Sequence, residues 1–107
     1  MPLGLFAVEV SGQSMSPTFS SGDWLLARRR GRVRAGVLVV AHHERVGLMV
    51  KRVTAIRQAT TGPQVWLQGD NPEPAASTDS RHFGWVDADR IVGTVLVRYR
   101  RGRTQSS

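Results

Sequence analysis

The sequence predicts a mainly β protein, a small antiparallel barrel or sandwich formed by a single domain. Three observations predict it. The chain has 107 residues, which is the length of one domain. Its apolar residues, 40% of the total, gather in short runs rich in Val, Leu and Ile, with turn residues between most of them. No segment repeats its apolar residues every 3.6 positions over three turns, as a long amphipathic helix would.

The expected strands follow in order along the chain. They are Leu5–Val10, Trp24–Ala27, Val37–Ala41, Val46–Ile56, Val65–Gln68 and Ile91–Tyr99. The longest irregular piece is Gly69–Asp89, and a loop of that length in a small domain is more often functional than idle. We expect a folded domain over residues 1–99 and a basic polar tail over residues 100–107.

Composition excludes several classes of protein. No stretch approaches the roughly 18 consecutive apolar residues needed to span a bilayer. The N-terminus lacks the basic segment of a secretory signal and reaches Glu9 too early for one. The chain has no Cys, which excludes disulfides and thiolate metal sites. We therefore expect a soluble, cytoplasmic domain.

The formal charge is +7, and the isoelectric point near 11.6 is typical of nucleic-acid binders. Arginine runs lie at Arg28–Arg34 and at residues 98–103. Aromatic residues that would stack on bases are sparse, and none interrupts the first run. We interpret the runs as a solvated hairpin tip and a charged tail, with no nucleic-acid partner. One hypothesis, motivated by charge alone, is that Arg28–Arg34 recognises an acidic patch on a substrate.

Lys51 is the one Lys among fifteen cationic residues. Lysine can lose its proton when buried, whereas arginine stays charged, so a lone Lys suggests a site that needs a neutral amine. Composition alone leaves chance retention an equal alternative. By the two-residue period of a strand, Lys51 shares a face with Met49, Val53 and Ala55, which would desolvate the amine and lower its pKa. The alternative is a lysine whose stem packs while its head reaches water.

Ser14 lies in the stretch SGQSMSPTF at residues 11–19, directly after the first expected strand. Gly12, two residues earlier, lets the backbone adopt a positive φ and leaves room for a substrate carbonyl. A serine on such a turn presents its hydroxyl and its own N–H outward, and acyl transfer needs both a nucleophile and an oxyanion donor.

The three histidines are the usual candidates for the base. His42 and His43 are adjacent and directly continue the expected strand Val37–Ala41, so they point to opposite faces and do not readily form one site or a metal cluster with Glu44. His82 lies in the long irregular piece beside Arg81. None of the three has the sequence context of a triad histidine, which leaves Lys51 as the better placed base.

Three blocks of the chain resemble the boxes of the type I signal peptidase family of Ser/Lys proteases. They are SGQSMSPT at 11–18, VKRV at 50–53 and GDNPEPAASTDSRHFG at 69–84, and the later RIVGTV segment also fits. The resemblance implies a β protease core of the signal peptidase and LexA-like type. It implies Ser14 as nucleophile, Lys51 as general base and the Ser14 N–H as oxyanion donor, supported by Gly12 and Met15. Some members carry a serine at the position of Gly12.

The third block departs slightly from the family. Its spacing from Gly69-Asp70-Asn71 is two residues longer than the common pattern. Ser77 falls where members have a serine that orients the lysine amine. Asp70, Asn71, Asp79 and Arg81 are implied to be structural, with Asp79 and Arg81 expected to form an ion pair that holds the loop.

The branch within the family is inferred from what the sequence lacks. Typical signal peptidases have N-terminal membrane anchors and a large accessory β region, whereas this sequence begins directly at the strand before Ser14. It is most similar to the small soluble proteases that mature nickel-type superoxide dismutase. The resemblance implies removal of the N-terminal leader of the dismutase precursor, the protein partner, by a cytoplasmic enzyme with no cofactor. Nickel would belong to the substrate and not to the protease.

Three alternatives stay open. One is a signal peptidase proper that processes exported preproteins. Another is a LexA-like self-cleaving regulator, against which the chain offers no room for a DNA-binding domain and a cleavable linker. The non-enzyme alternative is a basic β binding module in which Ser14 and Lys51 are inert.

Overall fold

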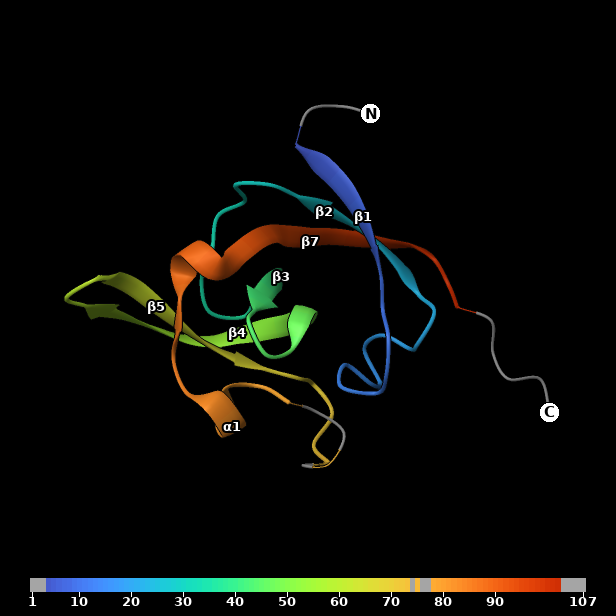
Figure 1. Ribbon diagram of the computed structural model, residues 1–107. Helices are drawn as coiled ribbons and strands as arrows, with labels where there is room; N and C mark the ends of the chain where they lie inside the picture. The colour runs from blue at the N-terminus through green and yellow to red at the C-terminus, as the bar shows by residue number, and fades with distance from the viewer. Residues whose placement is uncertain (1–3, 74, 76–77, 103–107) are drawn as a thin grey trace.

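The computed structural model describes residues 4–73, 75 and 78–102. Within these residues, seven strands form one antiparallel sheet in the order β1-β2-β7-β3-β4-β5-β6 (Figure 1). The strands are β1 (Leu5–Glu9), β2 (Trp24–Arg28), β3 (Leu38–His43), β4 (Gly47–Ala59), β5 (Gly62–Gln68), β6 (Val86–Asp87) and β7 (Ile91–Arg100). The predicted mainly β fold is confirmed.

The six expected strands all form, and β4 and β5 are longer than predicted. Buried side chains alternate with more exposed ones in β4 and β5, and the two strands form a long antiparallel pair. The piece Gly69–Asp89 is less irregular than expected. It contains a short helix α1 (Ser80–Phe83), strand β6 and a 3-10 turn η2 (Ala88–Arg90). Within the described part of the chain, no helix is long and apolar enough to cross a membrane.

The sheet bends so that its β1-β2-β7 half lies over its β3-β4-β5 half (Figure 1). Two apolar clusters fill the interior. One cluster joins the two halves and consists of Val10, Met15, Phe19 and Leu25, packed against Val8, Leu38, Val50 and Val95. The other lies on β3 to β6 and buries Val39, Ala41, Met49, Val53, Val65, Leu67 and Val86. Val50 of β4 packs against the first cluster, and Met49 and Val53 of β4 belong to the second. Strand β4 therefore runs through the centre of the protein.

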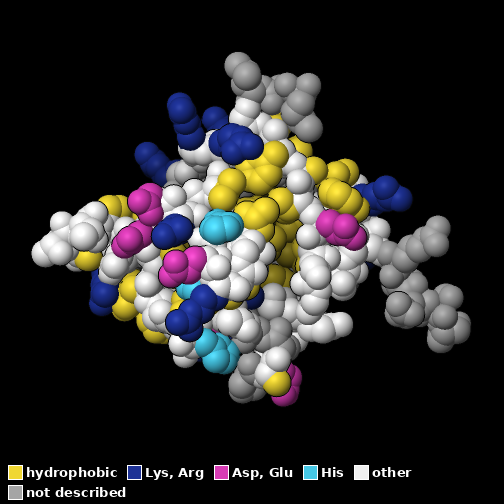
Figure 2. Space-filling model, in the orientation of Figure 1, with side chains coloured by type: hydrophobic (Ala, Val, Ile, Leu, Met, Phe, Trp, Pro, Cys, Tyr) yellow, Lys and Arg dark blue, Asp and Glu magenta, His cyan; other side chains and the backbone are white. Residues whose placement is uncertain are grey.

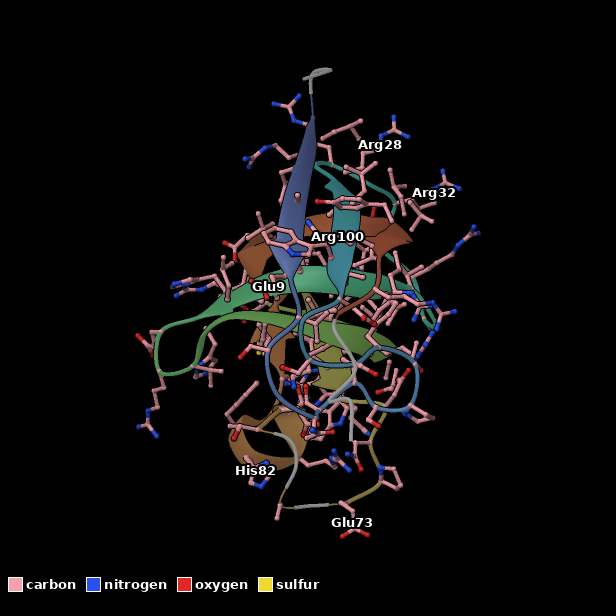
Figure 3. The ribbon with its side chains drawn as sticks, turned by 90° about the vertical axis from the view of Figure 1, so that its right-hand side faces the viewer. Glu9, Arg28, Arg32, Glu73, His82 and Arg100 are labelled. Atoms are coloured by element: carbon pink, nitrogen blue, oxygen red, sulfur yellow. The ribbon has the colours of Figure 1, made fainter. Side chains whose placement is uncertain are left out.

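The expectation of a hairpin with its tip at Arg28–Arg34 is wrong. Strand β7 lies between β2 and β3, so residues 29–37 connect two strands that do not pair. Their arginines are exposed, as expected, and the Arg29 guanidinium lies 4.9 Å from the centre of the Phe6 ring. Figure 3 shows Arg28 and Arg32 at one end of the molecule and His82 at the other.

Candidate active site

The loop that carries Ser14 is closed at its base. Val10 N–H donates to the Asp23 carbonyl at 2.8 Å, and Gly22 N–H donates to the Val10 carbonyl at 2.7 Å. The buried Asp23 carboxylate accepts from Ser20 N–H at 2.9 Å and from Gly102 N–H at 2.6 Å. These bonds fix both ends of the loop where β1 ends and β2 begins. We call residues 10–23 the nucleophile loop.

Inside the nucleophile loop, two apolar side chains anchor the turn that presents Ser14. Met15 is 1% exposed and Phe19 is buried beside it in the core. Phe19 N–H donates to the Met15 carbonyl at 2.8 Å. Gly12 has a φ of +81°, the left-handed region that favours glycine. Ser14 is therefore held half-buried on a short turn, directly before a residue locked into the core.

Lys51 lies on the buried face of β4. Met49, Lys51 and Val53 alternate with more exposed neighbours and all face inward, and Lys51 is only 3% exposed. Burial lowers the pKa of the Lys51 amine; the Asp79 carboxylate raises it and the Arg81 guanidinium lowers it again. The net effect is a pKa below the ordinary value of 10.5. The side chain is thus buried and does not reach out to water.

A cleft of about 540 Å³ is lined by both Ser14 and Lys51. Its walls come from residues 7–11, residues 48–51 and Thr78, with Met15 and Trp24. Figure 2 shows hydrophobic side chains gathered around a hollow on one face of the molecule. Among the described residues, the charged side chains that line the cleft are Lys51 and Glu9, which lies at the end of β1 and is labelled in Figure 3. The sequence-predicted nucleophile and base are therefore brought to one mostly apolar site.

Asp79 holds the third block beside Lys51. Its carboxylate is fully buried and accepts from Gly69 N–H at 2.8 Å. It also caps α1 through Arg81 N–H at 3.0 Å and forms an ion pair with the Arg81 guanidinium at 2.8 Å. These donors compensate the burial of the carboxylate. It therefore supplies a fixed negative charge near the Lys51 amine.

Asp70 ties the nucleophile loop to β4. Arg52 grips it with two bonds, Nε to Oδ1 at 2.9 Å and Nη2 to Oδ2 at 2.8 Å. Thr18 Oγ1 donates to the same carboxylate at 2.5 Å. The hydrogen bonds from Arg52 lower the pKa of Asp70 below its ordinary 3.8, burial opposes them, and the bond from Thr18 lowers it further. One carboxylate thus links the loop that carries Ser14 to the residue next to Lys51.

The other residues considered from the sequence are Asn71, Ser77 and the histidines, and each has a different structural setting. Asn71 bonds to the backbone of the nucleophile loop. Ser77 lies outside the described residues, so its predicted contact with Lys51 stays a prediction. His43 stacks on Phe83 with ring centres 4.2 Å apart, and the histidines are absent from the residues that line the cleft. In the described ranges, no three His, Asp or Glu side chains form a group that could hold a metal ion.

Sequence reasoning missed two residues of the site, Arg52 and Thr18. Arg52 stands inside the VKRV block beside the lysine, and Thr18 ends the SGQSMSPT block. Their inclusion in those blocks was the available signal. Neither residue type identifies its partner, because Asp70 is distant from both in the sequence and is brought to them only by folding.

Two comparisons with known proteins bear on the site. Residues 2–96 match the model of a protein family described as Peptidase S24-like. The chain is also similar to the mitochondrial ATP-independent inner membrane protease subunit 1a of Arabidopsis thaliana, with 35% identity over 114 residues. That match covers 83% of this chain and 67% of the plant protein. The family match includes Ser14 and Lys51 and all seven strands apart from the end of β7.

Proposed function

The chain belongs to the Peptidase S24-like family and is a serine-type protease, and from this premise we propose that Ser14 is its nucleophile and Lys51 its general base. The observation that carries the proposal is that both side chains line one cleft in which Lys51 is almost fully buried. Burial favours the neutral amine, which is the form a general base needs near neutral pH. Because the family is one of proteases, a binding module with an inert Ser14 is set aside.

In the acylation step, the Ser14 hydroxyl oxygen attacks the scissile carbonyl carbon while its proton passes to the Lys51 amine. The carbonyl oxygen becomes an oxyanion and accepts a hydrogen bond from the Ser14 N–H. When the tetrahedral intermediate collapses, the carbon–nitrogen bond breaks and the leaving amine takes the proton from Lys51. The products are a free amino terminus and an ester between Ser14 and the other half of the substrate.

Deacylation repeats the sequence with water as the nucleophile. Lys51, again neutral, accepts a proton from a water molecule that attacks the ester carbonyl. The second tetrahedral intermediate expels the Ser14 oxygen, which recovers its proton from Lys51. The lysine returns to its starting state after each half-reaction, and the proposed mechanism uses no metal or other cofactor.

The substrate would bind in an extended conformation along β1. Residues 7–11 line the cleft consecutively, although successive side chains of a strand point to opposite faces. It is therefore the edge of β1 that borders the cleft. Within the described part of the sheet, β1 pairs only with β2 and leaves its other edge open. An open edge of this kind can add a peptide as a further strand by backbone hydrogen bonds.

For the substrate itself we propose the N-terminal leader of a nickel-type superoxide dismutase precursor, cut in the cytoplasm. Its support is the resemblance of the three sequence blocks. A second candidate is signal-peptidase-type processing of exported preproteins. This candidate is favoured by the Arabidopsis relative, whose name describes an inner membrane protease subunit. Both candidates use the same proposed dyad and differ only in the precursor.

The experiment that tests the proposal follows the intact mass of two precursors, a nickel superoxide dismutase and an exported preprotein, during incubation with the protein. Parent, Ser14→Ala and Lys51→Ala proteins are compared. Ser16→Ala, two residues away in the same loop, is the matched control. We expect one N-terminal cut by the parent and by Ser16→Ala, and none by the other two. Thermal unfolding of each variant shows that the loss is not a loss of fold.

The outcomes separate the dyad from the substrate. Cleavage by Ser14→Ala would overturn the proposed nucleophile, and cleavage by Lys51→Ala would overturn the proposed base. A cut in the preprotein but not in the dismutase precursor would replace the first substrate with the second. Adding lipid vesicles to both reactions shows whether either cut needs a membrane surface.

A further inference from the structure

Asn71 holds the backbone on both sides of the Ser14 α-carbon. Its N–H donates to the Ser14 carbonyl at 2.9 Å, and its side-chain Nδ2 donates to the Gln13 carbonyl at 2.8 Å. Its side-chain Oδ1 accepts from Glu73 N–H at 2.9 Å, which fixes the orientation of the amide group. A residue from the loop after β5 therefore grips two successive carbonyls of the nucleophile loop.

The grip on Gln13 has a consequence for the N–H of Ser14, because the two groups belong to one peptide unit. That unit is planar and trans, so its carbonyl and its N–H point in opposite directions. Fixing the direction of the Gln13 carbonyl thus fixes the direction of the Ser14 N–H. Ser16 N–H holds the same carbonyl at 3.1 Å and acts in the same sense.

The Ser14 N–H itself is not used for folding. Among the described residues, no backbone or side-chain acceptor takes its hydrogen bond. Ser14 also lines the cleft. A donor of fixed direction with no acceptor in the described chain suits an oxygen that arrives with the substrate, since an oxyanion donor works best when it is held in place beforehand.

We propose that Asn71 is a positioning residue that aims the oxyanion donor. Its side-chain amide holds the Gln13 carbonyl and thereby directs the Ser14 N–H toward the position of the developing oxyanion. This inference rests on the proposed role of Ser14 as nucleophile. It extends that role to a residue that contacts neither the substrate nor the reacting atoms and acts through one peptide plane.

The expected effect is on the transition state and not on the binding of the substrate. Removal of an oxyanion donor costs about 10²- to 10³-fold in rate. Asn71→Ala removes only one of the two bonds to the Gln13 carbonyl, so we expect a smaller loss in kcat of about tenfold, with KM unchanged. Asn71→Asp keeps the acceptor for Glu73 but loses the donor to Gln13, and should lose at least as much.

The test uses two peptide probes that differ in one group, an acetylated tripeptide ending in alanine aldehyde and the same peptide ending in the alcohol. Ser14 Oγ adds to the aldehyde carbon, the carbonyl π bond breaks, and the serine proton passes to Lys51. The resulting oxyanion needs the Ser14 N–H, whereas the alcohol fills the cleft without forming one. We expect Asn71→Ala and Asn71→Asp to weaken aldehyde binding about tenfold and to leave alcohol binding unchanged.

Two controls make the outcomes distinct. Ser16→Ala changes a side chain of the nucleophile loop but keeps the Ser16 N–H on the Gln13 carbonyl, so the ratio of aldehyde to alcohol affinity should stay at the parent value. Ser14→Ala should lose the preference for the aldehyde. If it keeps that preference, the proposed nucleophile fails. If Ser14→Ala loses it while both Asn71 variants keep it, only the positioning role of Asn71 is overturned.

Discussion

Lys51 and Arg52 are neighbouring basic residues on the two faces of strand β4, and the fold shifts their pKa values in opposite directions. Lys51 points inward between Met49 and Val53, and burial lowers its pKa. Arg52, the next residue, points to the other face, where the Asp70 carboxylate binds its guanidinium and raises its pKa. Because the side chains of a strand alternate, a step of one residue changes the setting from a buried face to a partly exposed face where a carboxylate binds the guanidinium.

The difference teaches which property of each cation the fold uses. An amine in an apolar setting is easily deprotonated, and lysine alone of the two side chains can supply a neutral base. A guanidinium keeps its charge and binds a carboxylate through two parallel bonds, which suits a structural link. Lys51 is thus suited to the proton transfer proposed for it, and Arg52 holds the nucleophile loop through Asp70.

The largest effect on cleavage should follow from Lys51→Arg. This variant places on the buried face of β4 the residue type that Arg52 provides on the other face. Arginine cannot act as a base, so cleavage of the precursor should fall about 10²- to 10⁴-fold, the usual contribution of a general base. The measurement is kcat/KM together with thermal unfolding. Lys51→Met, of similar length and without charge, is the matched variant and should be equally inactive. If Lys51→Arg retained a tenth of the parent activity, proton transfer to residue 51 would be ruled out.

A smaller effect is expected on the pH dependence of cleavage. The proposed mechanism needs the neutral amine of Lys51, so kcat/KM should rise with pH to an inflection below 10.5. The positive charge of Arg81 lowers the pKa of Lys51, and Asp79, its ion-pair partner, raises it. Arg81→Gln removes the charge that lowers the pKa of Lys51, so the Asp79 carboxylate raises that pKa with less opposition. The inflection should therefore move to higher pH.

The pH profile distinguishes electrostatics from simple damage to the site. At pH values above the shifted inflection, Arg81→Gln and the parent should converge, because both then carry a neutral lysine. The control is Arg57→Gln, because Arg57 also lies on β4 but is not one of the charges that shift the pKa of Lys51. It should keep the parent inflection. An unmoved inflection in Arg81→Gln would show that its charge does not act on the base.

The strands were predictable because each is a short apolar run between turn residues, a purely local pattern. The strand order was not. The wrong hairpin at Arg28–Arg34 came from pairing β2 with its sequence neighbour β3, which is the commoner arrangement. The chain instead places β7, from its far end, between them. Only long-range pairing decides this, and no residue within Arg28–Arg34 carries that information.

The candidate site also has features that local sequence patterns predict and features that only the fold reveals. The burial of Lys51 followed from the two-residue period of β4, and the turn at Ser14 followed from Gly12 and the preceding strand. The contacts of Asp70 with Arg52 and Thr18 were out of reach, because they join three segments whose proximity depends on the fold. Local patterns therefore indicated the candidate chemistry, while the bonds that hold it together needed the structure.

The smallest effect on cleavage is expected for Arg52→Lys, the converse exchange on the other face of β4. Lysine keeps the charge but cannot form both bonds to Asp70 or reach the Gly36 carbonyl in the same geometry. Charged hydrogen bonds contribute about 1.5 to 3 kcal/mol when buried, so this half-exposed group should lower the free energy of unfolding by about 1 to 2 kcal/mol. For a domain of this size that is a fall in Tm of roughly 5 to 10 °C.

Cleavage by Arg52→Lys should stay within about threefold of the parent, since the link to Asp70 is weakened but the amine of Lys51 is untouched. Arg57→Lys is the matched control on the same strand. Its guanidinium forms a solvent-exposed bond to Gln64 and lies over the Trp85 ring, so the stability loss should be smaller than at Arg52. If Arg52→Lys lost as much activity as Lys51→Arg at unchanged Tm, Arg52 would have a part in the chemistry, and the division between the two faces would fail.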